Sequence, residues 1–299
     1  MRAFVRVARL RSFSGAAREL GVSQATVSKH VQMLEDWLGV HLFHRTTRRV
    51  ALSEAGEIFL VKFNRVLEDI EAARESVGPA APIRGNLRIT APVAFGSTCL
   101  GPLIVDFLQQ HPDLSVNIEL LDRTVDVIEE GFDLAISADP IDSASLVSHR
   151  LTGLNYIACA SPHYLANHPV PTQPLDLADH DCIIGSGSAT ETWRFAGPKG
   201  DLDVEIRGRL QVNSALLRRD AARAGAGILF SADYLVRDDI TAGRLVRVLP
   251  DFTTNAGTMS AICSPHSAAM PKVRSLVTFL VQQLGKTPQL TSNDPLTSE

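Results

Sequence analysis

Residues 13–28 read FSGAARELGVSQATVS, and their pattern predicts two short helices joined by a tight turn. Apolar residues recur at helical spacing before Gly21, and glycine commonly ends helices. Ser14 can cap this helix, and Ser23 can cap a following helix that runs to about Leu38. The three-residue connection between them has the length found in helix-turn-helix units. An amphipathic stretch over residues 2–10 predicts one more helix before them.

The helix predicted after Ser23 has two different faces. Val27, Val31, Leu34 and Leu38 recur at intervals of four, three and four residues and must face a core. The opposite face carries hydrogen-bonding side chains without acids, which suits a helix in the major groove of DNA; an ordinary solvent-exposed face is the alternative. The residues expected to contact DNA from this helix and its cap are Ser23, Gln24, Ala25, Thr26, Ser28, Lys29 and Gln32.

A cationic β-hairpin is predicted directly after this helix. Mostly apolar segments, residues 40–43 and 50–52, flank the sequence RTTRR at positions 45–49. A wing of this kind lies along the phosphates and contributes salt-sensitive affinity with little sequence information. We expect phosphate contacts from Arg45, Arg48 and Arg49, and purely structural arginines are the alternative.

The charges of the chain are divided unevenly. Residues 1–53 contain nine Lys and Arg against three Asp and Glu, whereas the whole chain has a formal net charge of −4. The remainder is therefore acidic. A basic head on an acidic body is typical of a protein of which one end meets a polyanion and the other does not.

A long helix is expected from Glu54 to about Ser76, with Ser53 as its cap and Gly78 and Pro79 after its end. Its apolar residues repeat at alternating intervals of four and three, the stripe of a helix that packs lengthwise on another helix. We expect a homodimer or homotetramer held by this stripe, and packing against its own domain is the alternative. The residues expected at the dimer contact are Phe59, Phe63, Val66, Ile70 and Ala73.

Beyond Pro79 and Pro82 the pattern changes to strands that alternate with helices, which predicts an α/β body. Strand, helix and strand are expected over residues 87–91, 100–110 and 114–120. Later elements are expected as a helix over 125–130, strands over 132–136, 154–160 and 204–212, a helix over 215–224, a strand after 227 and a final helix from Pro271 that returns to the first lobe. The predicted domains are a head (1–53), a linker helix (54–78), a hinge (79–85), a body (86–285) with lobe I at about 86–161 and 266–285 and lobe II at about 162–265, and a mobile tail (286–299).

The motifs together resemble a known family. The stretches FSGAA at 13–17, VSQATVS at 22–28 and LSEAG at 52–56 are similar to the winged helix-turn-helix of LysR-type transcriptional regulators. Residues 96–97, GFDLAI at 131–136 and GAGI at 225–228 resemble the effector domain of the same family. The resemblance implies an all-α winged head, an antiparallel pair of linker helices and a two-lobed α/β effector domain like periplasmic binding proteins. It also implies double-stranded promoter DNA and a small-molecule effector as partners, with RNA polymerase as a further partner of an activator.

An effector is expected between the lobes, near the carboxyl ends of strands and the first turns of helices. The turn after the first strand of the body can offer backbone N–H groups and hydroxyls to a polar or anionic group. Serine and asparagine after two other strands are expected to face the same cleft, although helix caps or loop hydrogen bonds are equally good interpretations of each residue alone. The residues expected at this site are Pro92, Val93, Ser97, Thr98, Ser137 and Asn213.

Other classes of protein find little support in the sequence. There is no Gly-x-Ser-x-Gly elbow, no complete dinucleotide fingerprint, and no metal spacing among the nine histidines, so no enzyme, cofactor or metal site is predicted. The four cysteines are far apart and are expected to be buried, reduced thiols. No apolar run is long enough to span a membrane and no signal peptide is recognised, so a cytoplasmic protein is expected rather than a transport protein. A purely architectural DNA binder would not need the two-lobed body.

Overall fold

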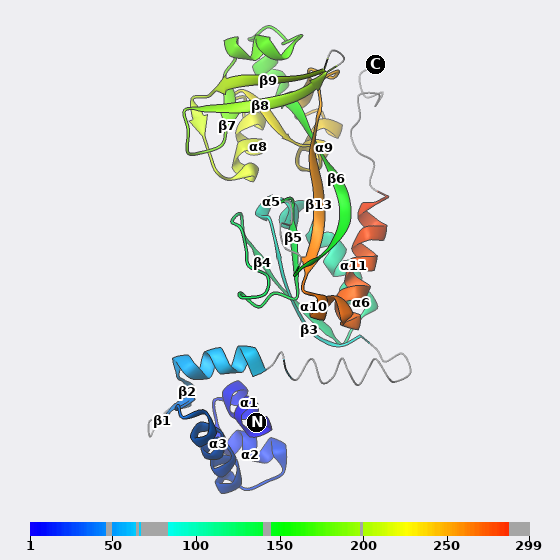
Figure 1. The fold of residues 1–299 in the computed structure, drawn as a ribbon. Helices are drawn as coiled ribbons and strands as arrows, with labels where there is room; N and C mark the ends of the chain where they lie inside the picture. The colour runs from blue at the N-terminus through cyan, green and yellow to red at the C-terminus, as the bar shows by residue number, and fades with distance from the viewer. Residues whose placement is uncertain (46–49, 64–65, 67–82, 140–144, 198–199, 287–299) are drawn as a thin grey trace. The chain divides into compact units, whose positions relative to one another are not determined.

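The computed structural model describes residues 1–45, 50–63, 66, 83–139, 145–197 and 200–286. The chain divides into two compact units, residues 1–81 and residues 82–299, and each has a hydrophobic core of its own (Figure 1). Several predicted residues lie outside the described ones, namely Arg48, Arg49, Ile70, Ala73 and the tail from residue 287.

The N-terminal unit begins with three helices and a short hairpin. The helices are α1 (Arg2–Leu10), α2 (Phe13–Leu20) and α3 (Gln24–Leu38). The antiparallel strands β1 (Phe43–Arg45) and β2 (Val50–Leu52) follow, and residues 54–63 and 66 are helical. These elements confirm the three predicted helices, the hairpin and the beginning of the linker helix.

Serine side chains determine where three of these helices begin. Ser23 Oγ accepts from the Thr26 amide at 3.1 Å, and Ser53 Oγ accepts from the Gly56 amide at 3.0 Å, as predicted. The predicted cap of α2 is wrong, because Ser12 Oγ accepts from the Gly15 amide at 3.0 Å and Ser12 has the extended backbone of a capping residue. Ser14 lies inside the first turn of α2.

The core of this unit joins all its elements. Phe4 and Val7 of α1 are fully buried, together with Val27 and Val31 of α3, and Leu34 is buried beside them. The predicted inner face of α3 is therefore confirmed, with Leu38 half-buried at its end. Each fully buried side chain of this size contributes about 1.5–3 kcal/mol to folding.

A nine-stranded sheet forms the framework of the second unit. Its strand order is β10-β7-β11-β6-β13-β5-β3-β4, with β12 beside β6, and β8 and β9 form a separate hairpin. The strands are β3 (Gly85–Ala91), β4 (Leu114–Leu120), β5 (Leu134–Ser137), β6 (Val147–Ala160), β7 (Cys182–Ile184), β8 (Thr190–Gly197), β9 (Gly200–Arg207), β10 (Leu210–Gln211), β11 (Ile228–Ala232), β12 (Val246–Val248) and β13 (Thr254–Cys263).

Two long strands, β6 and β13, run through both halves of this unit (Figure 1). At one end β13 pairs with β5, which continues to β3 and β4; at the other end β6 pairs with β11 and β12. We name the half around β3, β4 and β5 lobe I and the half around β7 to β12 lobe II. The shared strands make the lobes parts of one sheet, with β6 and β13 as the hinge between them.

Helices cover the sheet in both lobes. Lobe I carries a continuous helical run after β3, composed of α5 (Val93–Phe95), the π-helix η1 (Gly96–Leu100) and α6 (Gly101–Gln110). The last helix, α11 (Pro271–Leu284), returns to lobe I as predicted: Phe279 contacts Phe107 of α6 at 5.3 Å between ring centroids. The remaining helices are α7 (Pro162–Leu165), η2 (Pro174–Asp179), α8 (Ala215–Arg223), α9 (Asp233–Thr241) and α10 (Pro265–Ala269).

Two predicted elements are wrong. Residues 125–130 form a turn instead of a helix, because Asp126 Oδ1 accepts from the amides of Ile128 and Glu129 and closes a tight loop. The strand expected over 204–212 is divided into β9 and β10. Gly208 lies between these strands, where a Cβ atom would come within 2.1 Å of the Cys182 carbonyl oxygen, so the chain turns there against β7.

Candidate DNA interface and effector pockets

The outer face of α3 presents most of the predicted DNA contacts to solvent. Gln24, Ala25, Lys29 and Gln32 are exposed, whereas Ser28 is half-buried. Ser23 and Thr26 serve the cap, since Ser23 Oγ lies 2.8 Å from Thr26 Oγ1 as well as binding its amide. This geometry is that of a recognition helix with free side chains near its N-terminus.

One acid lies on this face, which the sequence analysis missed. Gln32 Nε2 donates to Asp36 Oδ1 at 2.8 Å, one turn further along α3. The sequence offers the i, i+4 spacing of the two residues as a signal for this pair. Gln32 must exchange Asp36 for a base or phosphate when it contacts DNA.

A buried glutamate fixes the hairpin to α3. Glu35 is only 3% exposed, and its Oε1 accepts from the amides of Leu42 at 2.8 Å and Phe43 at 3.3 Å. Ser53 Oγ donates to the His41 carbonyl at 2.6 Å and holds the other side of the same turn. The hairpin therefore has a defined direction relative to α3. Its strand residue Arg45 pairs with Val50 through the backbone.

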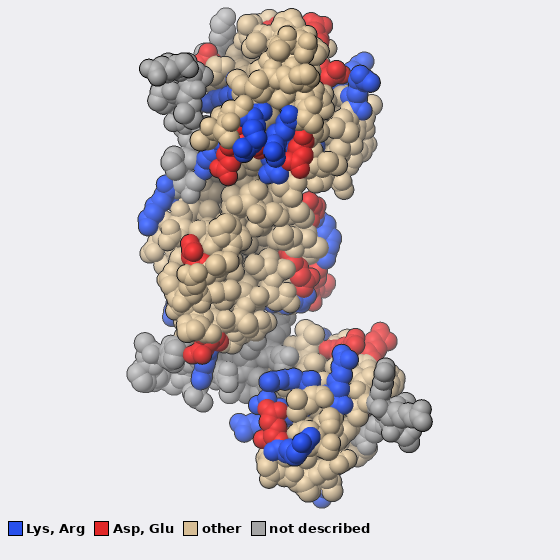
Figure 2. All heavy atoms as spheres, turned by 180° about the vertical axis from the view of Figure 1, so that it is seen from behind, with Lys and Arg blue, Asp and Glu red and all other residues tan. Residues whose placement is uncertain are grey.

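The surface of the N-terminal unit is predominantly basic. On the face shown in Figure 2, Lys and Arg side chains predominate over Asp and Glu on this unit. Arg6 is among the paired cations, with Nη1 at 2.6 Å from Glu19 Oε1. A surface of this charge attracts a polyanion at long range.

The helix after the hairpin turns part of its predicted dimer stripe towards its own unit. Phe59 meets Phe4 edge to face at 5.3 Å between ring centroids, and Phe63 stacks on Phe59 at 5.7 Å and is buried. Val66 is exposed, and so are Ile58 and Val61, which the prediction left out. The alternative interpretation, packing against its own domain, therefore holds for Phe59 and Phe63.

In lobe I a pocket of about 480 Å³ lies at the carboxyl ends of β3, β4 and β5, and we name it the strand-end pocket. Pro92 and Ser137 line it, as the sequence predicted. Its charged lining residues are Asp122, Asp139 and Arg123. Arg123 is held by Glu130, with Nη2 to Oε2 at 2.6 Å, and this hydrogen bond keeps the pKa of Glu130 below its ordinary value.

The structure does not bring the other predicted effector residues to this pocket. The Val93 amide donates to Asp122 Oδ1 at 2.9 Å, and the Thr98 hydroxyl donates to the Ala94 carbonyl at 2.7 Å. Ser97 and Asn213 are exposed and are not among the residues that line the described pockets. The idea of free N–H groups at this turn is thus wrong for Val93, because a carboxylate already occupies its amide.

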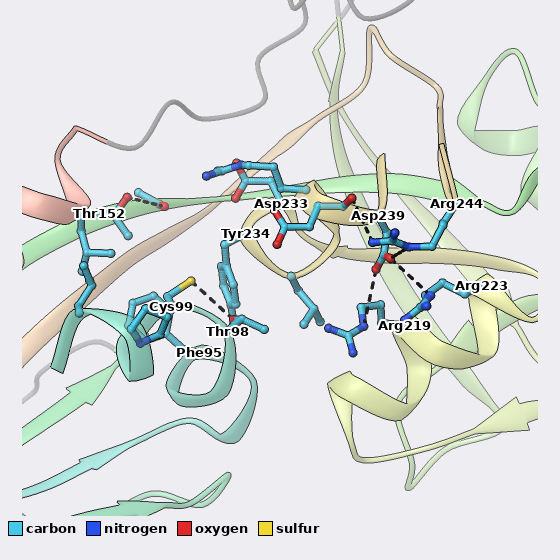
Figure 3. A pocket seen from close by; sticks show the side chains of 17 residues that line it. Phe95, Thr98, Cys99, Thr152, Arg219, Arg223, Asp233, Tyr234, Asp239 and Arg244 are labelled. Carbon is cyan, nitrogen blue, oxygen red and sulfur yellow. Dashed lines mark hydrogen bonds and ion pairs between the residues drawn. The ribbon is translucent and has the colours of Figure 1, made fainter. Parts of the chain in front are cut away.

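A second pocket, of about 420 Å³, lies between lobe I and α8 and α9 of lobe II beside the hinge strand β6, and we name it the hinge pocket (Figure 3). Thr98 and Cys99 lie on its lobe I side and Arg219, Arg223 and Arg244 on its lobe II side. The sequence analysis missed these arginines, because a basic stretch on α8 gives no sign that Arg244 joins it in space.

The four cysteines are free thiols. Cys159, Cys182 and Cys263 are buried as predicted, and burial raises the pKa of Cys159 and of Cys182 to about 12. The expectation of burial is wrong for Cys99, which is half-buried beside the hinge pocket because η1 turns it towards this opening. Burial still raises the pKa of Cys99, so it is a neutral thiol at neutral pH.

Comparisons with known proteins agree with this architecture. Residues 1–57 match the family model described as "Bacterial regulatory helix-turn-helix protein, lysR family", and residues 80–285 match "LysR substrate binding domain". This chain belongs to the LysR family of transcriptional regulators.

Relatives and solved structures in this family extend over almost the full length. The regulator DmlR of Escherichia coli K12 is 32% identical over 285 residues, which cover 94% of this chain and 92% of DmlR. The transcriptional activator TtdR of Escherichia coli strain UTI89 is 31% identical over 288 residues, with 92% and 91% covered. The structure of CrgA from Neisseria meningitidis, a LysR-type regulator, has a TM-score of 0.65 at 29% identity and covers 95% of this chain and 97% of that one.

As a LysR-type regulator, the protein binds DNA through its helix-turn-helix unit and a small molecule through its two-lobed domain, and it is not an enzyme. Regulators of this family form oligomers. Within the described residues, no helix is both long and apolar enough to cross a lipid bilayer. No group of three or more metal-ligating side chains occurs in the described part of the chain.

Proposed function

We propose that α3 reads promoter DNA through Gln24, Ala25, Ser28, Lys29 and Gln32, while Ser23 and Thr26 shape its first turn. The observation that carries this proposal is the outer face of α3: its side chains are free, while Glu35 ties the other side of the helix to the hairpin. Arg45, Arg48 and Arg49 contribute phosphate contacts from the hairpin. The two assignments divide specificity and general affinity between helix and hairpin.

The proposal can be tested by titrating promoter DNA and random DNA with the Lys29→Ala variant. We expect a loss of about 1–3 kcal/mol on the promoter and a smaller loss on random DNA. Lys62→Ala is the matched control, because Lys62 is exposed in the same unit but lies on the helix after the hairpin. Equal effects of the two substitutions on both DNAs would contradict base reading by Lys29.

For the effector, the proposed site is the strand-end pocket, with Pro92 and Ser137 as contacts. Two carboxylates, Asp122 and Asp139, line it, and its arginine is engaged by Glu130. This balance favours a polar effector with hydrogen-bond donors over an anionic one. Val93, Ser97, Thr98 and Asn213 are not retained as contacts, since the first and third are bonded within the fold and the others are exposed elsewhere.

The effector acts, in this proposal, through the assembly. Linker helices of two chains pair and hold two heads on half-sites of a roughly palindromic operator, in a dimer or a dimer of dimers. An effector with different affinities for two arrangements of the lobes then changes head spacing and promoter binding. The name of TtdR calls that relative an activator; as an activator, this protein also contacts RNA polymerase. Its proposed place of action is the cytoplasm, where bacterial promoters lie. The division into residues 1–53, 54–78, 79–85, 86–285 and 286–299 belongs to this proposal.

A further inference from the structure

The hinge pocket is separate from the proposed effector site. No lining residue is common to the hinge pocket and the strand-end pocket. The hinge pocket receives residues from both lobes and from the hinge itself: Phe95 and Leu103 from lobe I, Thr152 and Gly153 from β6, and α8 and α9 from lobe II. A molecule bound here therefore contacts every part that has to move when the lobes change their arrangement.

Three arginines converge on one buried carboxylate in the lobe II side of this pocket. Asp239 is 4% exposed, and its oxygens lie 2.5 Å from Arg244 Nε, 3.4 Å from Arg223 Nε and 3.8 Å from Arg219 Nε (Figure 3). The exposed Asp220 accepts from Arg219 Nη2 at 3.0 Å and lies 3.4 Å from Arg223 Nη1. Three cations thus share two carboxylates, and a positive charge is left over.

The cluster also leaves donors available. Asp239 engages the Nε side of Arg219, Arg223 and Arg244, and in the described part of the chain Arg219 Nη1, Arg223 Nη2 and Arg244 Nη1 have no acceptor. The side chains of these three arginines are 20%, 40% and 47% exposed, so water or a ligand can reach them. Planar arginine forks bind carboxylates in bidentate geometry.

The lobe I side of the pocket is apolar. Phe95 is buried and meets Tyr234 edge to face at 5.4 Å between ring centroids, and Leu103 and Leu284 continue this surface. Burial raises the pKa of Tyr234, so its hydroxyl is neutral at neutral pH and adds no negative charge. An aromatic side chain beside aliphatic ones suits a flat apolar group.

We propose that the hinge pocket is a second ligand site, which binds a small organic acid with its carboxylate at Arg219, Arg223 and Arg244 and its apolar body against Phe95, Tyr234 and Leu103. The ligand bridges the lobes and stabilises one arrangement of them. Because Pro92 of the strand-end pocket and Phe95 of the hinge pocket belong to the same turn of helix, the two sites are coupled, and each ligand changes the affinity of the other by the same factor.

Phenylacetate is a suitable probe, with phenylacetamide as its neutral counterpart and inorganic phosphate as an anion without an apolar body. Calorimetry on the full-length protein is expected to show binding of phenylacetate at least tenfold tighter than of either comparison compound. Arg223→Gln is expected to weaken phenylacetate binding about tenfold, and Arg194→Gln, an exposed arginine of β8 paired with Asp203, is expected to leave it unchanged. Leu103→Trp fills the pocket from the opposite wall without touching the arginines and is expected to abolish binding.

The outcomes separate this site from the strand-end pocket. Ser137→Leu, which alters only the strand-end pocket, is expected to leave phenylacetate binding within twofold of the parent protein. Equal affinity for phenylacetate and phenylacetamide, no binding of phenylacetate, or binding that survives both Arg223→Gln and Leu103→Trp would each overturn the proposal. These results leave promoter binding and the response to a strand-end ligand untouched, because those depend on other residues.

Discussion

Oε1 of Glu35 in α3 accepts a hydrogen bond from the backbone amide of Leu42, 2.8 Å away, where the chain enters the hairpin. The glutamate is almost completely buried, and the same oxygen also accepts from Phe43. A side chain in the recognition helix thus carries out the pairing that the backbone of this turn cannot provide for itself. The direction of the hairpin and the position of the helix are consequently parts of one unit.

Replacement of Glu35 by alanine tests this link. Glu35→Ala leaves two buried amides without acceptors, at a cost of about 1–3 kcal/mol for each unsatisfied group. We expect a lower midpoint of thermal unfolding and weaker binding to promoter and random DNA alike, because the hairpin loses its direction. Glu35→Gln retains an oxygen acceptor and is expected to lose less on both measurements. Unchanged stability in Glu35→Ala would show that water replaces the carboxylate.

The helix after the hairpin offers a second test, since its apolar residues divide between two faces. Ile58 and Val61 are exposed, whereas Phe59 and Phe63 pack on their own unit. The double variant Ile58→Asp and Val61→Asp is expected to yield monomers with weakened promoter binding and an intact head, as measured by light scattering and circular dichroism. Phe63→Asp serves as the contrast, because it is expected to unfold the head. A double variant that keeps the mass of the parent oligomer would place the contact on other residues.

The sequence was sufficient to predict those parts of the fold that depend on local patterns. The caps Ser23 and Ser53 and the inner face of α3 follow from spacing alone, and the structure confirms them. Phe59 shows the limit: a repeat of four and three residues is equally compatible with a partner helix and with the core of the same unit, and only the position of Phe4 decides between them. Hydrophobic periodicity specifies that a face is covered, not what covers it.

The candidate sites were less predictable, for a related reason. Pro92 and Ser137 were found because strand ends at one edge of a sheet lie together, whatever the details of the loops. The Arg219, Arg223 and Arg244 cluster depends on how α8, α9 and the following turn pack around Asp239, and no local pattern contains this information. Val93 shows the converse, because its amide is free by sequence and occupied by Asp122 in space.

The pH dependence of lobe II follows from Asp176. Its carboxylate accepts from the Thr172 amide at 2.8 Å and also from Gln173, which lowers its pKa from 3.8 to about 2. The charged form is therefore favoured in the folded state, so this contribution to stability is present above about pH 3.8 and is lost as the pH falls towards 2. Asp176→Asn is expected to lower the urea midpoint at pH 6, and the difference from the parent protein should shrink between pH 4 and pH 2. A constant difference over this range would exclude the charge as its cause.

Ser137 provides the test of the strand-end pocket. Its side chain lines that pocket, and its hydroxyl accepts from the Asp139 amide at 3.0 Å, so Ser137→Leu both fills the space and removes a polar group. The promoter bound in the genome can be identified first, and metabolites of the neighbouring genes then serve as candidate effectors in a reporter assay and in calorimetry. We expect Ser137→Leu to abolish the response and the binding of the active metabolite, while promoter binding without it persists, because the helix-turn-helix unit is unchanged. Ser115→Leu makes the same substitution at the opposite end of the lobe I strands, where the side chain is exposed, and is expected to respond as the parent protein does. A Ser137→Leu variant that binds the metabolite with unaltered affinity would exclude the strand-end pocket, and a response lost in Leu103→Trp instead would move the effector to the hinge pocket.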